Sequence, residues 1–511
     1  MIDFKFFLTL IVLLGSIGNV NAGTAKGSVY IDTNKNGIRD GKEPGVAGIS
    51  VSNGNDVVIT DSKGEWRLNI DDDFTLFVIK PAGYSVAVNQ NMIPEHFYRH
   101  NSEQKIPKSI DFPLYLVPEK KKFSALFFSD TQARGLREVD FILHDAVDEL
   151  IGTDALFGVS LGDIVADDPG LFSEINQGLA QIGIPWYNTF GNHDSDREAT
   201  NNNERDETFE RFFGPSTYAF EYADVVFIDL NNIYFNPNGK YRPHFTENQL
   251  TFVENYINLI PENKLVVLMM HAPIVACDNQ KRMYQIIQNR KYTFSISGHV
   301  HEQLNLFVGK ENGWEGEEEH HHLINATVCG SWWCGTNDEL GIPHATMNDG
   351  APNGYSRITF DGNQYSVEFK AARRPADYQM NIYLPNEISK SGLETTQILV
   401  NVFAGSQRSK VEMKIGKNGE WILMEQLKTI DPECLRMHKL NSFLSETVNG
   451  EVLEDVFGFK MDYPSTSDHI WGSKLPKNIL SGTHTVTVRT TDMYNKTWQA
   501  HRIFRVRESE N

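Results

Sequence analysis

The sequence of 511 residues has little cysteine, no basic excess and, after its first residues, no long hydrophobic run. Four cysteines are too few for a disulfide framework to hold a chain of this length together. Lys and Arg number 47 against 67 Asp and Glu, a formal net charge of -20, so binding to a nucleic-acid polymer or an anionic membrane surface is not expected. No later stretch reaches the ~18 apolar residues of a membrane-spanning helix. The cysteines are Cys277, Cys329, Cys334 and Cys434, of which Cys329 and Cys334 either pair or remain free thiols.

The first 22 residues are typical of a secretory signal peptide. Lys5 precedes the apolar run FFLTLIVLLGSIG, which is short for a membrane span, and the small-residue pattern Val20-Asn21-Ala22 follows it. We therefore expect cleavage after Ala22 and an exported protein that is periplasmic, on the cell surface or secreted.

The rest of the chain changes its hydrophobic pattern twice. Residues 23–118 contain short alternating strand patterns such as EWRLNI, separated by Gly and Asn, which predict a β-sandwich. Residues 119–370 alternate apolar strand-like runs with helical stretches, as in an α/β domain with a mostly buried sheet. Residues 371–511 return to strand patterns, so we expect a second β-sandwich.

In the middle region, five apolar runs are followed by residue types that commonly bind metals. The runs SALFFS, LFGVSL, IPWYNTF, LVVLMM and YTFSIS are followed, directly or after one glycine, by Asp130, Asp163, Asn192-His193-Asp194, His271 and His299-Val300-His301. Ligands of open α/β sheets bind outside the carboxyl ends of the strands, so we expect all five ends at one edge of one sheet. A Gly-Asp turn or a lone histidine has an ordinary structural explanation, but the shared position of all five does not.

These residue types favour a pair of divalent cations. Carboxylates, imidazoles and an amide oxygen are ligands for Zn, Mn or Fe. A shared carboxylate can hold two ions about 3.5–4 Å apart, an arrangement suited to in-line phosphoryl displacement. The glycines before Asp163, Asn192 and His299 are expected to allow sharp turns and to leave room for substrate.

In order and spacing, GD at 162–163, GNHD at 191–194 and GHVH at 298–301 resemble the calcineurin-like metallophosphoesterases. The predicted sandwiches on both sides resemble a multidomain, exported bacterial branch of that family. The resemblance implies a metallophosphoesterase-type α/β sandwich core and hydrolysis of a phosphate ester by a metal-bridging hydroxide, without a covalent phosphoenzyme. It also implies roles for the motif residues: Asp163 bridges two ions, Asp130 and His301 hold the first, and Asn192, His271 and His299 hold the second.

The same resemblance places His193 against the phosphate, where it stabilises or protonates the leaving oxygen, and makes Asp194 the residue that orients His193. The family's first motif is Asp-x-His, but here Gln132 stands in the place of the histidine. A neutral amide oxygen is a harder and weaker ligand, so Gln132 should loosen the first ion or shift its preference away from Zn. The two ions are expected to be drawn from Mn, Fe, Zn and Mg, and the sequence leaves open which of them bind.

A loop rich in Trp, Gly and Asn follows GHVH. Its candidate residues either shape a substrate pocket or form a structural junction with the last domain; they are Trp332, Trp333, Asp349, Asn353 and Tyr355.

Residues 32–43 match the spacing of a twelve-residue calcium loop. The ligands of such a loop would be Asp32, Asn34, Asn36, the Ile38 carbonyl, Asp40 and Glu43. No flanking helices are evident, so the expected role is a structural calcium ion on a β-domain, and the alternative is an Asn/Gly turn with solvated carboxylates.

The sequence thus predicts an exported dinuclear-metal phosphoesterase acting on a phosphate mono- or diester. Its substrate is expected to be a phosphorylated small molecule, glycan or lipid headgroup. One alternative is a surface glycan-binding or adhesion protein on a degenerate phosphoesterase scaffold, and another is an extracellular nucleotidase. The oligomeric state is left open.

Overall fold

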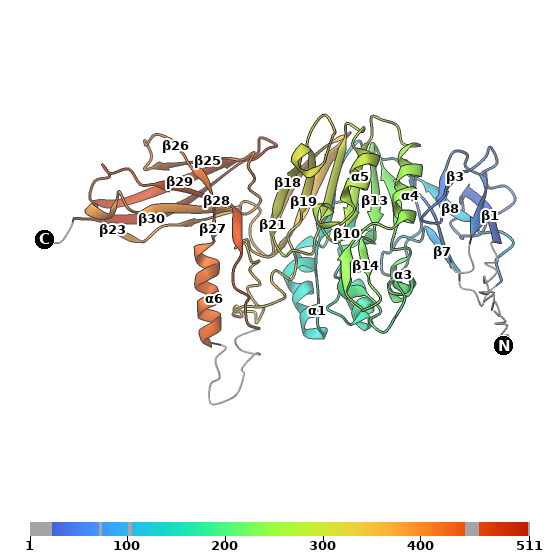
Figure 1. Ribbon diagram of the computed structural model, residues 1–511, viewed down its shortest axis with the longest axis horizontal. Coiled ribbons are helices and arrows are strands. Elements are labelled where there is room, and N and C mark those ends of the chain that lie inside the picture. Colours follow the sequence, from blue (N-terminus) through green and yellow to red (C-terminus); the bar gives the residue numbers. More distant parts are fainter. Residues whose placement is uncertain (1–22, 71–73, 101–104, 445–458, 509–511) are drawn as a thin grey trace, which may run out of the picture.

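The computed structural model describes residues 23–70, 74–100, 105–444 and 459–508, so the predicted signal peptide lies outside the described residues. Three groups of strands follow one another along the chain, and Figure 1 shows them in a row with the α/β part in the middle. None of the helices in the described ranges is long and apolar enough to cross a membrane.

The N-terminal part consists of two four-stranded sheets packed face to face. The first has the order β4 (Glu65–Ile70), β1 (Gly23–Ile31), β8 (Phe112–Leu116), β6 (Tyr84–Ser85). The second has the order β3 (Val57–Ile59), β2 (Ser50–Ser52), β5 (Phe74–Val78), β7 (Phe97–His100). Alternate residues Trp66, Leu68 and Ile70 of β4 are buried, because successive side chains of a strand face opposite sides. They share one core with Leu76 and Val78 of the other sheet, so the expected sandwich is present.

The middle part, residues 122–371, contains two larger sheets and a two-stranded ribbon. The five-stranded sheet has the order β11 (Trp186–Asn188), β10 (Gly158–Ser160), β9 (Lys122–Phe128), β20 (Gly354–Asp361), β21 (Gln364–Ala371). The six-stranded sheet has the order β12 (Tyr218–Tyr222), β13 (Val225–Leu230), β16 (Leu265–Met270), β17 (Thr293–Ser297), β19 (His320–Ile324), β18 (Leu304–Val308). The ribbon pairs β14 (Ile233–Phe235) with β15 (Tyr241–Pro243).

Helices cover the outer faces of both sheets. The helices of this part are α1 (Leu136–Ile142), α2 (Phe172–Leu179), α3 (Glu207–Phe213), α4 (Glu247–Ile257) and α5 (Gln280–Ile287). In β9, Ala125 and Phe127 belong to the core shared with β13 and β16, whereas Leu126 and Phe128 belong to the core shared with α1, α2 and α3. This alternation explains why SALFFS reads as continuously apolar: both faces of the strand are covered.

The expectation of one sheet is corrected by this arrangement. β9, β10 and β11 lie in the five-stranded sheet, but β16 and β17 lie in the six-stranded one. The predicted ligands therefore come from neighbouring edges of two sheets packed face to face. The apolar runs are equally continuous in both cases, so periodicity could not distinguish them.

The C-terminal part is also a pair of sheets around one core. One has the order β22 (Met380–Tyr383), β24 (Gln397–Val402), β28 (Thr466–Lys474), β27 (Glu425–Ile430). The other has the order β23 (Glu387–Ser389), β30 (Thr497–Arg507), β29 (Gly482–Thr491), β25 (Lys410–Ile415), β26 (Ile422–Leu423). The structure adds the helix α6 (Pro432–Leu444), which the strand pattern did not predict. Its first turn is capped by Asp431, whose Oδ1 accepts hydrogen bonds from the backbone N–H groups of Glu433 (2.9 Å) and Cys434 (2.8 Å).

Candidate metal centre

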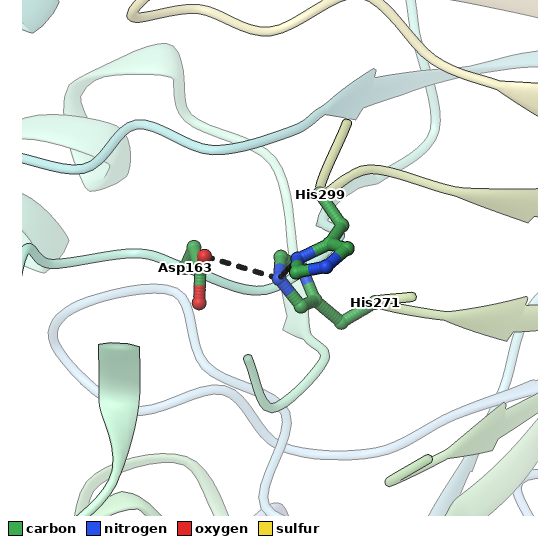
Figure 2. Close-up of side chains that lie close together, drawn as sticks. All are labelled: Asp163, His271 and His299. Atoms are coloured by element: carbon green, nitrogen blue, oxygen red, sulfur yellow. Dashed lines mark hydrogen bonds and ion pairs between the residues drawn. The ribbon is translucent and has the colours of Figure 1, made fainter. Parts of the chain in front are cut away.

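The predicted ligands follow the carboxyl ends of parallel strands. β10 pairs in parallel with both β9 and β11, and β16 pairs in parallel with β17. These registers bring the chain segments after the strands to a common edge in each sheet. The two edges meet where Asp163, His271 and His299 place their ligand atoms within 4.8 Å of one another (Figure 2).

His271 lies at the centre of one half of the cluster. Its Nε2 is 3.1 Å from Asp163 Oδ2, 3.2 Å from Asn192 Oδ1 and 3.1 Å from His299 Nδ1. Its Nδ1 lies 2.8 Å from the carbonyl oxygen of Leu161, a contact that fixes the ring so that Nε2 faces the other ligands. The His271 side chain is fully buried.

Asp130 and His301 form the other half. Asp130 Oδ1 lies 3.5 Å from His301 Nε2, and Oδ2 accepts a hydrogen bond of 2.9 Å from the backbone N–H of His299. His301 Nδ1 lies 2.6 Å from the carbonyl oxygen of Gly330, which again turns Nε2 toward the cluster. Asp130 Oδ1 is buried and has no hydrogen-bond partner in the described part of the chain. A buried carboxylate oxygen without a hydrogen bond is costly unless a cation compensates it, so this donor set fits divalent metal ions.

The cluster favours positive charge at its centre. Burial alone would lower the pKa of His271, but the adjacent Asp163 carboxylate outweighs it and raises that pKa to about 9. Burial and then the neighbouring His271 lower the pKa of His299 to about 4. The pKa of Asp163 is lowered, because His271 and the other imidazoles outweigh its burial. In the metal-free protein a proton on His271 thus occupies the place that the carboxylates offer to a cation.

The backbone is strained at the same place. Five of the seven predicted metal ligands have a positive φ, a conformation that residues other than glycine rarely adopt; they are Asp130 (46°), Gln132 (36°), Asp163 (49°), His299 (76°) and His301 (58°). Strain of this kind persists where surrounding structure enforces it and is typical of functional sites.

Glycines of the motifs make room for neighbouring ligands. A Cβ at Gly191 would lie 2.3 Å from Asp163 Oδ1, and one at Gly298 would lie 2.3 Å from Asp130 Oδ2. Neither backbone has a positive φ, so close approach is what requires these glycines. The expectation that they leave room for substrate is therefore corrected: the space is filled by the predicted metal ligands.

Gln132 lies inside the cluster with its amide nitrogen toward Asp163. Its Nε2 donates to Asp163 Oδ2 (3.2 Å), and its Oε1 accepts from the thiol of Cys329 (3.4 Å). Ligation by Oε1 would need a half-turn of this amide, which exchanges its oxygen and nitrogen. Cys329 was not singled out as a neighbour of the site, because nothing in its sequence surroundings indicates it.

His193 is oriented by a carboxylate other than the expected one. Its Nδ1 lies 2.5 Å from Asp167 Oδ1, and Asp167 also forms an ion pair with the exposed Arg197. Asp194 instead accepts hydrogen bonds from three backbone N–H groups, those of Ile164, Val165 and Gly191. The predicted role of Asp194 is thus corrected. It ties the GD loop to the GNHD loop, because the short helical turn at 192–194 directs its side chain back into the protein.

Of the five predicted substrate residues, Trp332 reaches the cluster. Its half-buried ring lies 4.9 Å from the ring of His193 and 5.8 Å from that of His301, measured between centroids. Its carbonyl oxygen accepts a hydrogen bond of 2.6 Å from Arg134.

The other four residues are buried and bonded within the protein, so the prediction that they line a substrate pocket is wrong. Trp333 donates from Nε1 to the carbonyl oxygen of Thr131 (2.9 Å), and Tyr355 donates to Glu149 (3.0 Å). Asn353 donates to Asp145 and to the carbonyl oxygen of Val328 (2.9 Å). Asp349 accepts hydrogen bonds at the junction with the C-terminal sheets. Side-chain direction in an irregular loop does not follow a sequence period, which is why one Trp faces the site and its neighbour the core.

Tyr241 of β15 was missed. Its ring is 6.0 Å from that of His299 and its side chain is 39% exposed. Burial and then the charge of Asp163 raise its pKa, as expected for a phenol beside this cluster. It lies in a ribbon far from every motif along the chain, so no sequence signal marked it.

The side chains of the predicted calcium loop form hydrogen bonds within the loop. Asp32 accepts from the backbone N–H groups of Lys35 (2.6 Å) and Gly37 (2.8 Å), and Glu43 accepts from those of Thr33 (2.8 Å) and Asp40 (3.0 Å). The remaining predicted ligands also interact within the loop: Asn34 donates to Asp40 (2.6 Å), and Asn36 accepts from the N–H of Ile38 (2.8 Å). Calcium binding stays a prediction.

All four cysteines are free and buried. Of the two alternatives for Cys329 and Cys334, the structure therefore has the free thiols.

Three family models match successive parts of the chain. They describe the N terminal of calcineurin-like phosphoesterase over residues 33–117, the calcineurin-like phosphoesterase over 123–303 and the C terminal of calcineurin-like phosphoesterase over 320–498. A purple acid phosphatase from yellow lupin (Lupinus luteus) seeds is 11% identical in sequence, with a TM-score of 0.36, over 64% of this chain and 67% of that chain. A search of curated proteins found no match.

The fold and the cluster define a metallophosphoesterase-type α/β core between two β-sheet domains. The chain belongs to the calcineurin-like metallophosphoesterases that carry both N-terminal and C-terminal domains.

Proposed function

We propose that this protein is an exported phosphoesterase that uses two divalent metal ions to hydrolyse a phosphate mono- or diester. The observation that carries the proposal is the buried Asp130 Oδ1, which lies 3.5 Å from His301 Nε2 but accepts no hydrogen bond in the described part of the chain, in a cluster of carboxylates and imidazoles. Asp130 and His301 would hold one ion, the set Asn192, His271 and His299 the other, and Asp163 both. Such ions, when bound, neutralise phosphate oxygens and lower the pKa of a water to generate the nucleophile.

His193 is the proposed acid for the leaving oxygen. Asp167 occupies its Nδ1 side, so Nε2 is left to face the substrate. When the ring is protonated, both nitrogens carry protons, and Nε2 can pass one to the oxygen that leaves phosphorus. The Asp167 carboxylate holds the ring in place and compensates its positive charge.

The leaving group is proposed to be bulky and to have a flat face. Trp332 lies against His193 and His301, and Tyr241 lies against His299, so the cluster has an aromatic ring on each of these sides. Aromatic rings pack well against sugars, bases and aryl groups. A phosphorylated glycan, a nucleotide and a lipid headgroup that contains a sugar ring meet this requirement, so nucleotidase activity falls within the proposal. The adhesion alternative is less well supported, because a degenerate site would have lost several ligands, whereas the motifs depart from the family pattern only at Gln132.

The test is hydrolysis by the purified full chain. The metal-free protein is reloaded with Mn²⁺, Fe²⁺, Zn²⁺ or Mg²⁺ and assayed with p-nitrophenyl phosphate and bis-p-nitrophenyl phosphate. We expect metal-dependent turnover of at least one substrate, and its loss in Asp163→Asn. Absence of turnover with every ion, or full activity in Asp163→Asn, would refute the proposal. Export is tested separately, by sequencing the N-terminus of protein recovered outside the cytoplasm, which should begin at Gly23.

A further inference from the structure

A buried hydrogen-bond network connects the C-terminal sheets to the segment that follows the GHVH motif. At its centre, Asp349 Oδ2 lies 2.9 Å from His469 Nε2, and both side chains are at most 1% exposed. Asp349 belongs to the loop after β19, and His469 belongs to β28 of the C-terminal part. Figure 1 shows that part beside the side of the core that carries β18 and β21.

Toward the metal centre, the network ends on Gln303. The backbone N–H of Gln303 donates to Asp349 Oδ2 at 2.7 Å, and its side-chain Oε1 accepts from the N–H of Ala326 at 2.6 Å. Gln303 follows His301 by two residues. Because His301 has a positive φ and needs an enforced backbone, the anchoring of Gln303 also constrains His301.

Toward the C-terminal part, the network continues through β28 and β24 to the start of helix α6. His469 Nδ1 lies 2.7 Å from Asn401 Oδ1. Asn401 Nδ2 donates to Asp431 Oδ2 (2.8 Å), the residue that caps α6, and also to the backbone oxygen of Asp349 (3.3 Å). Both nitrogens of His469 are therefore engaged, and its ring cannot turn without breaking a buried contact.

The pair carries charge inside the protein. Burial would lower the pKa of His469, but Asp349 outweighs it and raises that pKa. A buried ion pair of this kind adds little net stability compared with well-packed apolar residues, and its best-attested use is to specify one arrangement. The arrangement specified here is the position of the segment 301–303 relative to the C-terminal sheets.

We propose that His469 and Asp349 form a positioning pair through which the C-terminal domain holds His301 in place for the first metal ion. The proposal rests on the proposed function in one respect: it assumes that Asp130 and His301 bind a divalent cation. It assigns the C-terminal domain a part in the metal centre although none of its residues lies among the predicted ligands.

The variants separate positioning from stability. His469→Leu removes both contacts of the ring, whereas His469→Gln keeps an N–H donor near the position of Nε2 for Asp349. His484→Gln is the matched control at a half-buried histidine of β29, whose Nε2 lies 2.7 Å from the carbonyl oxygen of Leu480. In the full-length, metal-free protein, Mn²⁺ titration should show two ions for wild type and for His484→Gln. In His469→Leu the dissociation constant of one ion should rise about 10-fold or more, and His469→Gln should restore most of that loss.

A second measurement does not need metal. Hydrogen exchange of the peptide 298–306 should be faster in His469→Leu than in wild type and unchanged in His484→Gln. The proposal is overturned if the peptide 298–306 of His469→Leu exchanges at the wild-type rate. It is also overturned if folded His469→Leu binds Mn²⁺ as wild type does. If His469→Leu does not fold, Asp349→Asn takes its place with the same expected results. If neither the wild type nor any variant binds metal, the proposed function is refuted. The exchange measurement then still decides whether His469 and Asp349 position the segment 301–303.

Discussion

Replacing Gly298 by alanine is expected to remove most of the activity by moving one carboxylate. A Cβ built at this position lies 2.3 Å from Asp130 Oδ2, whereas ordinary contacts begin at 3.4 Å, so one of the two groups must move by about 1 Å. The φ of Gly298 is not positive, so alanine adds no backbone strain and the effect is steric. The displaced oxygen is also the one that accepts from the N–H of His299.

The magnitude follows from the geometry. A misplacement of about 1 Å in a reacting constellation costs on the order of 10²-fold in rate, equivalent to about 2.7 kcal/mol of transition-state stabilisation. We therefore expect kcat/KM of Gly298→Ala for p-nitrophenyl phosphate to fall by about 10²-fold, together with weaker retention of one metal ion. The measurements are steady-state kinetics and elemental analysis after gel filtration.

The matched control is Gly41→Ala. Gly41 has open space around the added Cβ and no positive φ, so this variant should keep wild-type activity. Circular dichroism of Gly298→Ala must show a folded protein for the comparison to hold. Near-wild-type activity with two bound ions in Gly298→Ala would refute the reasoning, because it would mean that Asp130 does not serve the reacting centre.

Four further predictions concern the site and its surroundings. Asp167→Asn should lower kcat by about 10–100-fold with unchanged metal content, since it removes the carboxylate beside the proposed acid; a change in metal content instead of kcat would contradict this role. Trp332→Ala should raise KM for aryl phosphates and leave urea unfolding nearly unchanged, whereas Trp333→Ala should cost about 3–5 kcal/mol of unfolding free energy, because the second ring is fully buried. Metal-free protein should release a proton on binding Mn²⁺ at pH 7, because the pKa of His271 is raised to about 9; pH-stat titration measures it. The raised pKa also means that this proton stabilises the metal-free fold fully below pH ~6.5, the ordinary histidine value, and that the contribution is lost as the pH rises through about 9. Equal stability of the metal-free protein at pH 6 and pH 10 would contradict that assignment.

The strand ends that carry the cluster could be predicted from the sequence because their signals are local. An apolar run buried on both faces, followed directly or after one glycine by a polar residue, is visible in a short window, and this pattern predicts the positions of Asp130, Asp163 and His271. The assignment of the runs to one sheet failed because strand partners are chosen by packing over long sequence distances. β9 and β16 read alike but lie in different sheets.

Adjacency along the chain misled the interpretation of GNHD. Asp194 is next to His193 in sequence, but the helical turn sends its carboxylate to backbone N–H groups on the other side. The carboxylate that meets His193 is Asp167, from a different loop. Likewise the exposed Tyr241 of the ribbon β14–β15 reaches His299 through the fold and not through any motif.

The sequence by itself determined the types of ligand, their order along the chain and the class of chemistry, because metal-binding side chains and strand periodicity are local properties. The tertiary structure decided which groups meet. The packing of two sheets brings Asp163 and His271 together, and the docking of a separate domain brings His469 to Asp349. These contacts join residues more than 100 positions apart, and they depend on the burial of apolar surface shared by many strands, which no single stretch of sequence encodes.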